Sequence, residues 1–231
     1  MRVLAVDTSS AVASCAVVED EKLVCERILN NKLTHSQTIM PMIASALAES
    51  DLQTADIDLF AAVCGPGSFT GLRIGVSAVK ALAHAAGKPC VAVSTLEAMA
   101  YNLMYSEHII SPIMDARRGE VYNALYRFND GIIEEIEAPR ALLVEECCAG
   151  LQAIGEKVIF LGDGVPVHRE KIVEILGEQA LFAEAHLGAQ MAGSAAVLAK
   201  RKEQIHYSKL APVYLRKSQA EREYELRNER K

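Results

Sequence analysis

The chain contains 231 residues, of which 51% are hydrophobic, and it carries a formal net charge of −6. A chain of this length and hydrophobicity can bury a substantial core in one large domain or two lobes, which excludes an intrinsically disordered protein. The negative charge argues against a protein whose main surface binds RNA by itself, because phosphate contacts require clustered Lys and Arg.

No apolar run in the sequence approaches the roughly 20 residues that are needed to cross a bilayer. The first seven residues, Met1 to Asp7, place an acid directly after four apolar residues. That pattern is not typical of a secretory signal peptide. We therefore expect a cytoplasmic protein that makes no contact with a membrane.

The first half of the chain predicts a three-strand meander that is followed by crossover connections. Strands are expected at 3–6, 13–18, 23–29, 60–64 and 91–93. Helices are expected at 35–50, with a kink at Pro41, at 68–86, and again after Ser94, which begins a capping box. This order predicts a mixed sheet flanked by helices.

The pattern then restarts, because an apolar run at 109–114 again ends at an aspartate, Asp115, and is followed by a turn and a strand at 120–128. Further on, the sequence predicts a strand at 158–161 and helices at 142–150, 171–176 and 188–203. The repeat indicates two related lobes. We expect a first lobe at 1–103, to which 208–231 returns, and a smaller second lobe at 104–207.

Two lobes that each begin with strand, aspartate, turn and strand resemble the α/β fold of the actin/Hsp70/sugar-kinase superfamily. In that superfamily the two turns hold the phosphates of ATP through backbone N–H groups, and glycine permits the close approach. Here both turns lack the features of a phosphate loop. The degenerate positions are Asp7, Thr8, Ser9, Asp115, Arg117 and Arg118.

The glycine-rich stretch from Gly65 to Gly75 is not a Walker A motif, because no Gly-Lys-Ser/Thr follows at the required spacing. It is better explained as a turn with a helix start, in which Ser68 caps the helix. Gly71 and Gly75 lie four residues apart on one helix face, where a second backbone can pack closely.

The helix from Gly71 to Ala86 has one narrow polar stripe, formed by Arg73, Ser77, Lys80 and His84. Its apolar arc covers about 200°, roughly twice what contact with one sheet requires. The helix from Ser36 to Ser50 shows a similar excess. A protein partner or another part of this chain could cover this surface, and the pattern leaves both alternatives open.

The histidines and cysteines do not form a recognisable site. No two histidines lie four residues apart, no H-E-x-x-H or G-x-S-x-G motif is present, and no C-x-x-C pair occurs. We interpret the cysteines as reduced thiols and expect no metal in this chain. They are Cys15, Cys25, Cys64, Cys90, Cys147 and Cys148.

Six motifs together resemble the TsaB family, also called YeaZ, which is paralogous to the TsaD/Kae-type proteins. The resemblance runs from the first strand to Arg216 and is loosest between Leu142 and Glu203. The motifs are Asp7-Thr8-Ser9, His35-Ser36-Gln37 with Pro41, Gly65 to Gly75, Val93-Ser94-Thr95-Leu96, Asp115 to Tyr122, and Pro212-Val213-Tyr214-Leu215-Arg216.

This resemblance implies a fold similar to TsaD without its active site. Thr95 and Met99 stand where TsaD-type proteins carry their metal-binding histidine pair, and neither suits a hard divalent ion or iron. The resemblance implies no catalytic residue and no cofactor in this chain, with ATP and metal expected in the partner subunits.

The resemblance also implies that the first two helices bind TsaD as a four-helix bundle, and that the TsaE ATPase joins the pair. The complex transfers threonylcarbamoyl to the adenosine beside the anticodon of tRNAs that read ANN codons, so that tRNA is reached through the complex. The isolated chain would self-associate through the same helices. The expected interface residues are Gln37, Met40, Ile43, Leu47, Phe69, Gly71, Leu72, Gly75, Val76 and Val79.

Two alternatives to such a scaffold subunit remain at this stage. An ATP-binding small-molecule kinase of the same superfamily would need working phosphate turns, and a metallopeptidase would need metal ligands. The charged tail at 216–231 is expected to be a solvated or frayed helix, with an RNA-contacting arm as the alternative.

Overall fold

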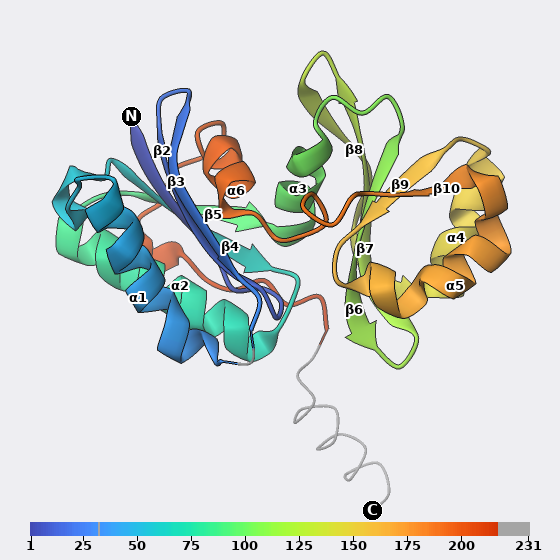
Figure 1. Cartoon of the computed structure of the whole chain (residues 1–231), viewed down its shortest axis with the longest axis horizontal. Helices are drawn as coiled ribbons and strands as arrows, with labels where there is room; N and C mark the ends of the chain where they lie inside the picture. Colours follow the sequence, from blue (N-terminus) through green and yellow to red (C-terminus); the bar gives the residue numbers. More distant parts are fainter. Residues whose placement is uncertain (32, 217–231) are drawn as a thin grey trace, which may run out of the picture.

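The computed structural model describes residues 1–31 and 33–216. Figure 1 shows two lobes, each built on a five-stranded mixed sheet, with helices on the outer faces and between the sheets. The tail at 217–231, for which a solvated helix was expected, lies outside the described residues. In the described part of the chain, no helix combines the length and the apolar character that crossing a bilayer requires.

The first sheet has the strand order β3-β2-β1-β4-β5. Its strands β1 to β3 form the expected antiparallel meander, and β4 and β5 add in parallel to β1. The strand bounds are Arg2–Asp7 (β1), Ala13–Glu19 (β2), Lys22–Leu29 (β3), Leu59–Gly65 (β4) and Cys90–Ser94 (β5).

The helices of the first lobe lie on both faces of this sheet. Side chains on β1 and β2 alternate between an outer core under α1 and α2 and an inner core that α3 and α6 share. The bounds are His35–Glu49 (α1), Phe69–Ala86 (α2), Thr95–Ala100 (α3) and Ala192–Ala199 (α6), with short 3-10 turns at Thr54–Asp56 (η1), Tyr101–Leu103 (η2) and Tyr207–Lys209 (η4).

The second sheet has the order β10-β9-β6-β7-β8, so each of its strands occupies the place of a strand in the first sheet. The element order is also the same in both lobes, which confirms the predicted duplication and the fold class. The bounds are Ile109–Arg117 (β6), Glu120–Asn129 (β7), Ile132–Leu143 (β8), Val144–Ile154 (α4), Val158–Leu161 (β9), Gly164–Leu176 (α5), Gly177–Gln179 (η3) and Ala180–Phe182 (β10).

Three predicted helices differ from the structure. The helix expected at 142–150 begins only at Val144, because β8 runs to Leu143. The helix expected at 171–176 begins at Gly164, since Pro166 lies in its first turn, where a proline breaks no hydrogen bond. The helix expected at 188–203 is confined to α6.

The short length of α6 has a local cause. The Asn102 side chain donates to the carbonyl oxygens of Leu187 and Ala189 at 2.8 and 2.9 Å, which holds this segment in a non-helical turn. The helix packs on the first sheet, where Ala192 and Ala196 join the inner core with Val3 and Val18. The expected boundary at residue 207 therefore does not follow the packing.

Candidate functional site

The helices α1 and α2 lie side by side on the outer face of the first sheet (Figure 1). Before α1, the backbone N–H of Thr34 donates to Gln37 Oε1 at 3.3 Å. Before α2, Ser68 Oγ accepts from the Gly71 N–H at 3.2 Å, which confirms the predicted cap. Gly87, with a φ of 65°, ends α2 in the left-handed conformation that favours glycine.

Most of the expected interface residues lie in the chain's own core, which corrects their placement at a partner surface. Leu72 and Val79 are fully buried, because α2 packs against the sheet, against α1 and against the turn after β1. Elements of this chain therefore cover much of the wide apolar arc. The buried residues are Ile43, Leu47, Gly71, Leu72, Gly75, Val76 and Val79.

The two glycines of α2 serve this internal packing. A Cβ at Gly71 would lie 2.1 Å from the Thr8 carbonyl oxygen, and a Cβ at Gly75 would lie 2.3 Å from Thr8 Oγ1. The close approach that the glycine spacing predicts is confirmed, and the second backbone is the turn of this chain that follows β1.

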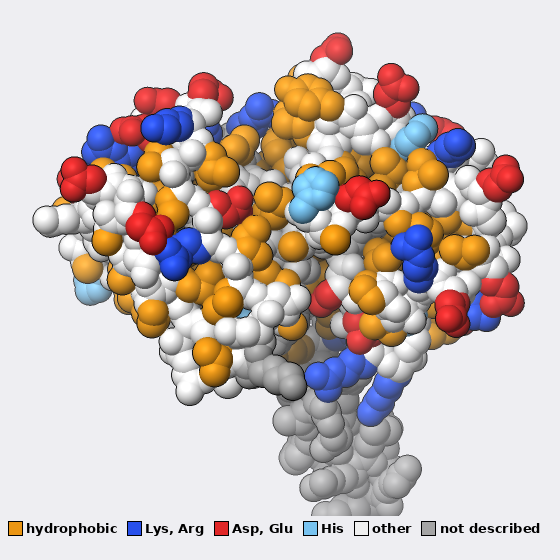
Figure 2. Space-filling view, in the orientation of Figure 1, with side chains coloured by type: hydrophobic (Ala, Val, Ile, Leu, Met, Phe, Trp, Pro, Cys, Tyr) orange, Lys and Arg blue, Asp and Glu red, His pale blue; other side chains and the backbone are white. Residues whose placement is uncertain are grey.

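The outward surface of the two helices is mostly small, apolar and uncharged. Met40 is 45% exposed at its centre, and the charged side chains of the two helices are Glu49, Arg73 and Lys80. Figure 2 shows the part over α1, at the lower left, as mainly hydrophobic and uncharged side chains. We define the α1–α2 face by ten exposed residues of the two helices, and Ser36, Glu49 and His84 are exposed on these helices as well. The ten are Gln37, Met40, Pro41, Ala44, Ala48, Thr70, Arg73, Ser77, Ala81 and Ala85.

The remaining expected interface residue, Phe69, is half-buried against the C-terminal segment. Its ring stacks on Tyr214 with centroids 4.3 Å apart, and Arg73 Nε donates to the Tyr214 hydroxyl at 2.9 Å. The Val213 N–H donates to the Cys64 carbonyl oxygen at 2.7 Å. Arg216 then reaches the second lobe, where it pairs with Glu120. Residues 210–216 thus connect the start of α2 with the β6–β7 turn.

The turn after β1, which was considered as a degenerate phosphate loop, is buried and already bonded. Asp7 and Thr8 are each 1% exposed and Ser9 is fully buried. The Ser9 N–H donates to Asp7 Oδ1, Thr8 Oγ1 donates to the Gly71 carbonyl oxygen, and the Ser68 N–H donates to the Ser9 carbonyl oxygen. The Ser9 N–H, one of the backbone donors of this turn, is therefore already bonded within the chain.

The turn after β6 differs, because its side chains are exposed. Arg117 and Arg118 point to solvent and have positive φ angles of 66° and 60°, and the Arg117 N–H donates to Asp115 Oδ1 at 2.8 Å. Arginine side chains thus stand where an ATP-binding turn would need glycine. Left-handed φ angles are strained for side-chain-bearing residues, so the conformation is held by its surroundings.

Two further residues that the sequence did not single out, Asp163 and His168, interact with the aspartates of these turns. Burial, together with the charges of Asp115 and Asp7, raises the pKa of Asp163 to about 6. His168 Nε2 lies 3.7 Å from Asp115 Oδ1. The negative charges that raise the pKa of Asp163 would also oppose the phosphates of a nucleotide.

Within the described part of the chain, no three His, Cys, Asp or Glu side chains are grouped so that they could hold a metal ion. Thr95 and Met99 on α3 are fully buried or nearly so, at 0% and 1% exposure. All six cysteines are free thiols. Burial raises the pKa of Cys64 and Cys147 to about 12, which keeps both thiols protonated.

The chain is similar to known proteins over nearly its whole length. A family model described as TsaD, tRNA N6-adenosine threonylcarbamoyltransferase, matches residues 22–224. The tRNA threonylcarbamoyladenosine biosynthesis protein TsaB of Bacillus subtilis is 34% identical, with 96% of each chain covered.

Solved structures support the same assignment. YeaZ from Pseudomonas aeruginosa has a TM-score of 0.78 at 27% identity and covers 93% of this chain and 99% of its own. A hexokinase from Thermus thermophilus has a TM-score of 0.50 at 12% identity and covers 87% of this chain and 99% of its own, a likeness that concerns the fold alone. The chain belongs to the TsaB (YeaZ) family of tRNA threonylcarbamoyladenosine biosynthesis proteins.

Proposed function

We propose that this chain is a non-catalytic scaffold subunit that binds TsaD through the α1–α2 face and holds it in its active form. The observation that carries the proposal is the outward surface of the two helices, which is nearly free of charge in a protein of net charge −6. Interface cores are depleted of charged residues, and Met is enriched there. Met40 would be the central contact.

The chemistry of the two turns supports the non-catalytic part of the proposal. In the turn after β1, the Ser9 N–H and carbonyl oxygen are already bonded to Asp7 Oδ1 and to the Ser68 N–H, and the buried carboxyl of Asp163 lies near both turns. ATP and metal would therefore belong to the partner subunits, with TsaE as a third protein. The complex would transfer threonylcarbamoyl to the adenosine beside the anticodon of tRNAs that read ANN codons, in the cytoplasm.

Without TsaD, the same face would pair with a second copy of the chain. Because one face would form both the homodimer and the complex with TsaD, the two assemblies would exclude each other. Adding TsaD to a homodimer should therefore convert it into a heterodimer.

Mixing with TsaD tests the proposal. Leu72 and Val76 are unsuitable for this test, because a charge at either would disrupt the core. Ala81→Glu on α2 is suitable, and Ala153→Glu on α4 is its matched control, since both alanines are exposed on outer helices. We expect co-elution with TsaD in size-exclusion chromatography for the natural chain and the control, and its loss for Ala81→Glu. Unchanged co-elution of Ala81→Glu would refute this placement.

Calorimetry with ATP tests the non-catalytic role separately. We expect no measurable heat of binding to the isolated chain. Tight ATP binding by the isolated chain would contradict the proposal and favour a small-molecule kinase of the same superfamily.

A further inference from the structure

A second feature of the first lobe lies away from the α1–α2 face. A cavity of about 250 Å³ opens between the β2–β3 hairpin, η2 and the start of α6. Its lining residue Val18 belongs to the inner core of the sheet, whereas α1 and α2 cover the outer face. A ligand in this cavity would therefore not compete with a protein on the α1–α2 face.

The walls of the cavity are mostly apolar and partly open to solvent. Leu23 is 51% exposed at the mouth, and Met104, Met191 and Val197 are half-buried. Methionine side chains adapt to ligands of different shape. Concave, largely apolar surfaces with a few placed polar groups are the usual form of small-molecule sites.

The distinctive polar group in this cavity is the carboxylate of Glu26. Its Oε1 accepts from the Gly193 N–H at 2.7 Å, and a Cβ at Gly193 would lie 3.2 Å from either carboxylate oxygen. Among the described residues, Oε2 has no hydrogen-bond donor and Glu26 has no ion-pair partner. Burial raises the pKa of Glu26, as expected for a carboxylate without a cation beside it.

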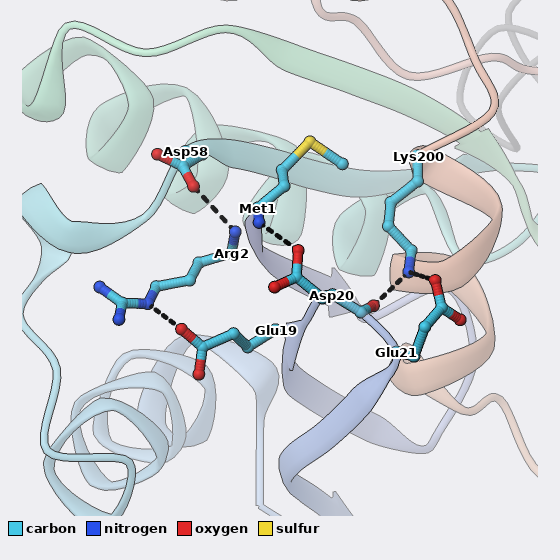
Figure 3. Close-up of polar contacts among 7 residues, drawn as sticks. All are labelled: Met1, Arg2, Glu19, Asp20, Glu21, Asp58 and Lys200. Atoms are coloured by element: carbon cyan, nitrogen blue, oxygen red, sulfur yellow. Dashed lines mark hydrogen bonds and ion pairs between the residues drawn. The ribbon is translucent and has the colours of Figure 1, made fainter.

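The basic groups around the cavity are already engaged elsewhere, as Figure 3 shows for its rim. Lys200 points to the Asp20 carbonyl oxygen and to Glu21, while the amino group of Met1 bonds to the Asp20 carboxylate. Arg27, the residue after Glu26, pairs with Glu49. The charges at the rim therefore offset one another, and the carboxylate of Glu26 is left as the unpaired negative charge that can attract a cation.

We propose that this cavity binds a small amphipathic organic cation, whose apolar body packs on Met104, Met191 and Val197 and whose ammonium group bonds to Glu26. A cation there would pair the carboxylate and cover the exposed apolar walls. The volume of about 250 Å³ lies just below the usual range of small-molecule pockets, about 300 to 1,000 Å³, which favours a small free molecule over a helix or strand of a partner.

The test uses phenethylamine as the cation and 2-phenylethanol as its neutral match, with the full chain followed by amide NMR. We expect phenethylamine to shift the signals of Gly193, Ser194 and Met104 in a saturable manner. The alcohol should bind about tenfold more weakly, as should the amine with Glu26→Gln, since a charge-assisted bond is lost. Glu21→Gln, a change at a fully exposed rim carboxylate, should leave binding within about twofold.

A second variant keeps the test decisive if Glu26→Gln fails to fold. Val197→Phe fills the cavity but keeps the carboxylate, and it should abolish binding. Equal binding of the amine and the alcohol, or unchanged binding in Val197→Phe, would overturn the proposal. Tighter binding of Nα-acetyl-arginine methylamide than of phenethylamine would also overturn it, because it would indicate a site for a protein side chain.

Discussion

The two lobes share one topology but differ in their outer helical layers. In the first lobe, α1 and α2 carry three charged residues, Glu49, Arg73 and Lys80. In the second lobe, the shorter helices α4 and α5 carry six, which are Glu145, Glu146, Arg169, Glu170, Lys171 and Glu174. Lys171 and Glu174 even form an ion pair on the surface of α5.

This difference shows that the fold alone does not determine the surface chemistry. Both layers bury their inward side chains in equivalent cores, and only the outward residues distinguish them. The second layer has the charged surface of a solvated helix pair, whereas the first has the composition of an interface core. This difference is the reason why we propose the partner face on the first lobe.

The largest expected effect comes from a charge on the inward side of α2. Leu72→Glu should destabilise the fold by several kcal/mol, because it places an unpaired carboxylate at a fully buried position. Ser77→Glu, on the exposed side of the same helix, should change the free energy of unfolding by less than about 0.5 kcal/mol. Urea denaturation measures both. A stable Leu72→Glu variant would show that the inward and outward sides are wrongly assigned.

Asp163 should make stability depend on pH. The pKa of Asp163 is raised from 3.8 to about 6 in the folded state, so the folded state binds a proton more tightly than the unfolded state does. This contribution is present below pH 4 and is lost as pH rises through about 6. At pH 8, Asp163→Asn should therefore be more stable than the natural chain by up to about 3 kcal/mol.

Thermal unfolding at pH 4 and pH 8 tests the role of Asp163. The stabilising effect of Asp163→Asn should be much smaller at pH 4, where the natural carboxyl group is protonated as well. An equal effect at both pH values would mean that the proton on Asp163 does not matter to stability.

The C-terminal segment should contribute a smaller amount. Tyr214→Ala removes the stack on Phe69 and the bond from Arg73, and should lower the free energy of unfolding by about 1 to 2 kcal/mol. Tyr105→Ala, at a side chain that is 86% exposed, is the control and should have almost no effect. If the two substitutions cost the same, the segment does not stabilise α2.

The sequence predicts the first lobe better than the second, for physical reasons. The strands β1, β2 and β4 are continuous apolar runs between turn signals, and they were placed to within one or two residues. The sequence does not predict the edge strand β8. Its exposed run of Glu134, Glu135 and Glu137, together with Pro139, leaves no alternation of apolar and polar residues to mark a strand. The strand β10 has only three residues, too few for a pattern.

The candidate site was predicted in part. The polar stripe of α2, with Arg73 and Ser77, does face solvent. The sequence could not show that the turn containing Thr8 packs on Gly71, because that contact joins residues 63 positions apart. It also gave no signal for Asp163, whose raised pKa depends on aspartates from two other turns.

The central claim is tested most directly by calorimetric titration of TsaD with two variants of this chain, Met40→Glu on α1 and Val173→Glu on α5. Each side chain is 45% exposed, so both substitutions should disturb the fold to a similarly small extent. The account predicts that Met40→Glu weakens TsaD binding by at least about a hundredfold, as for a central hot spot, while Val173→Glu leaves it unchanged. Equal affinity of both variants, or a loss confined to Val173→Glu, would contradict it.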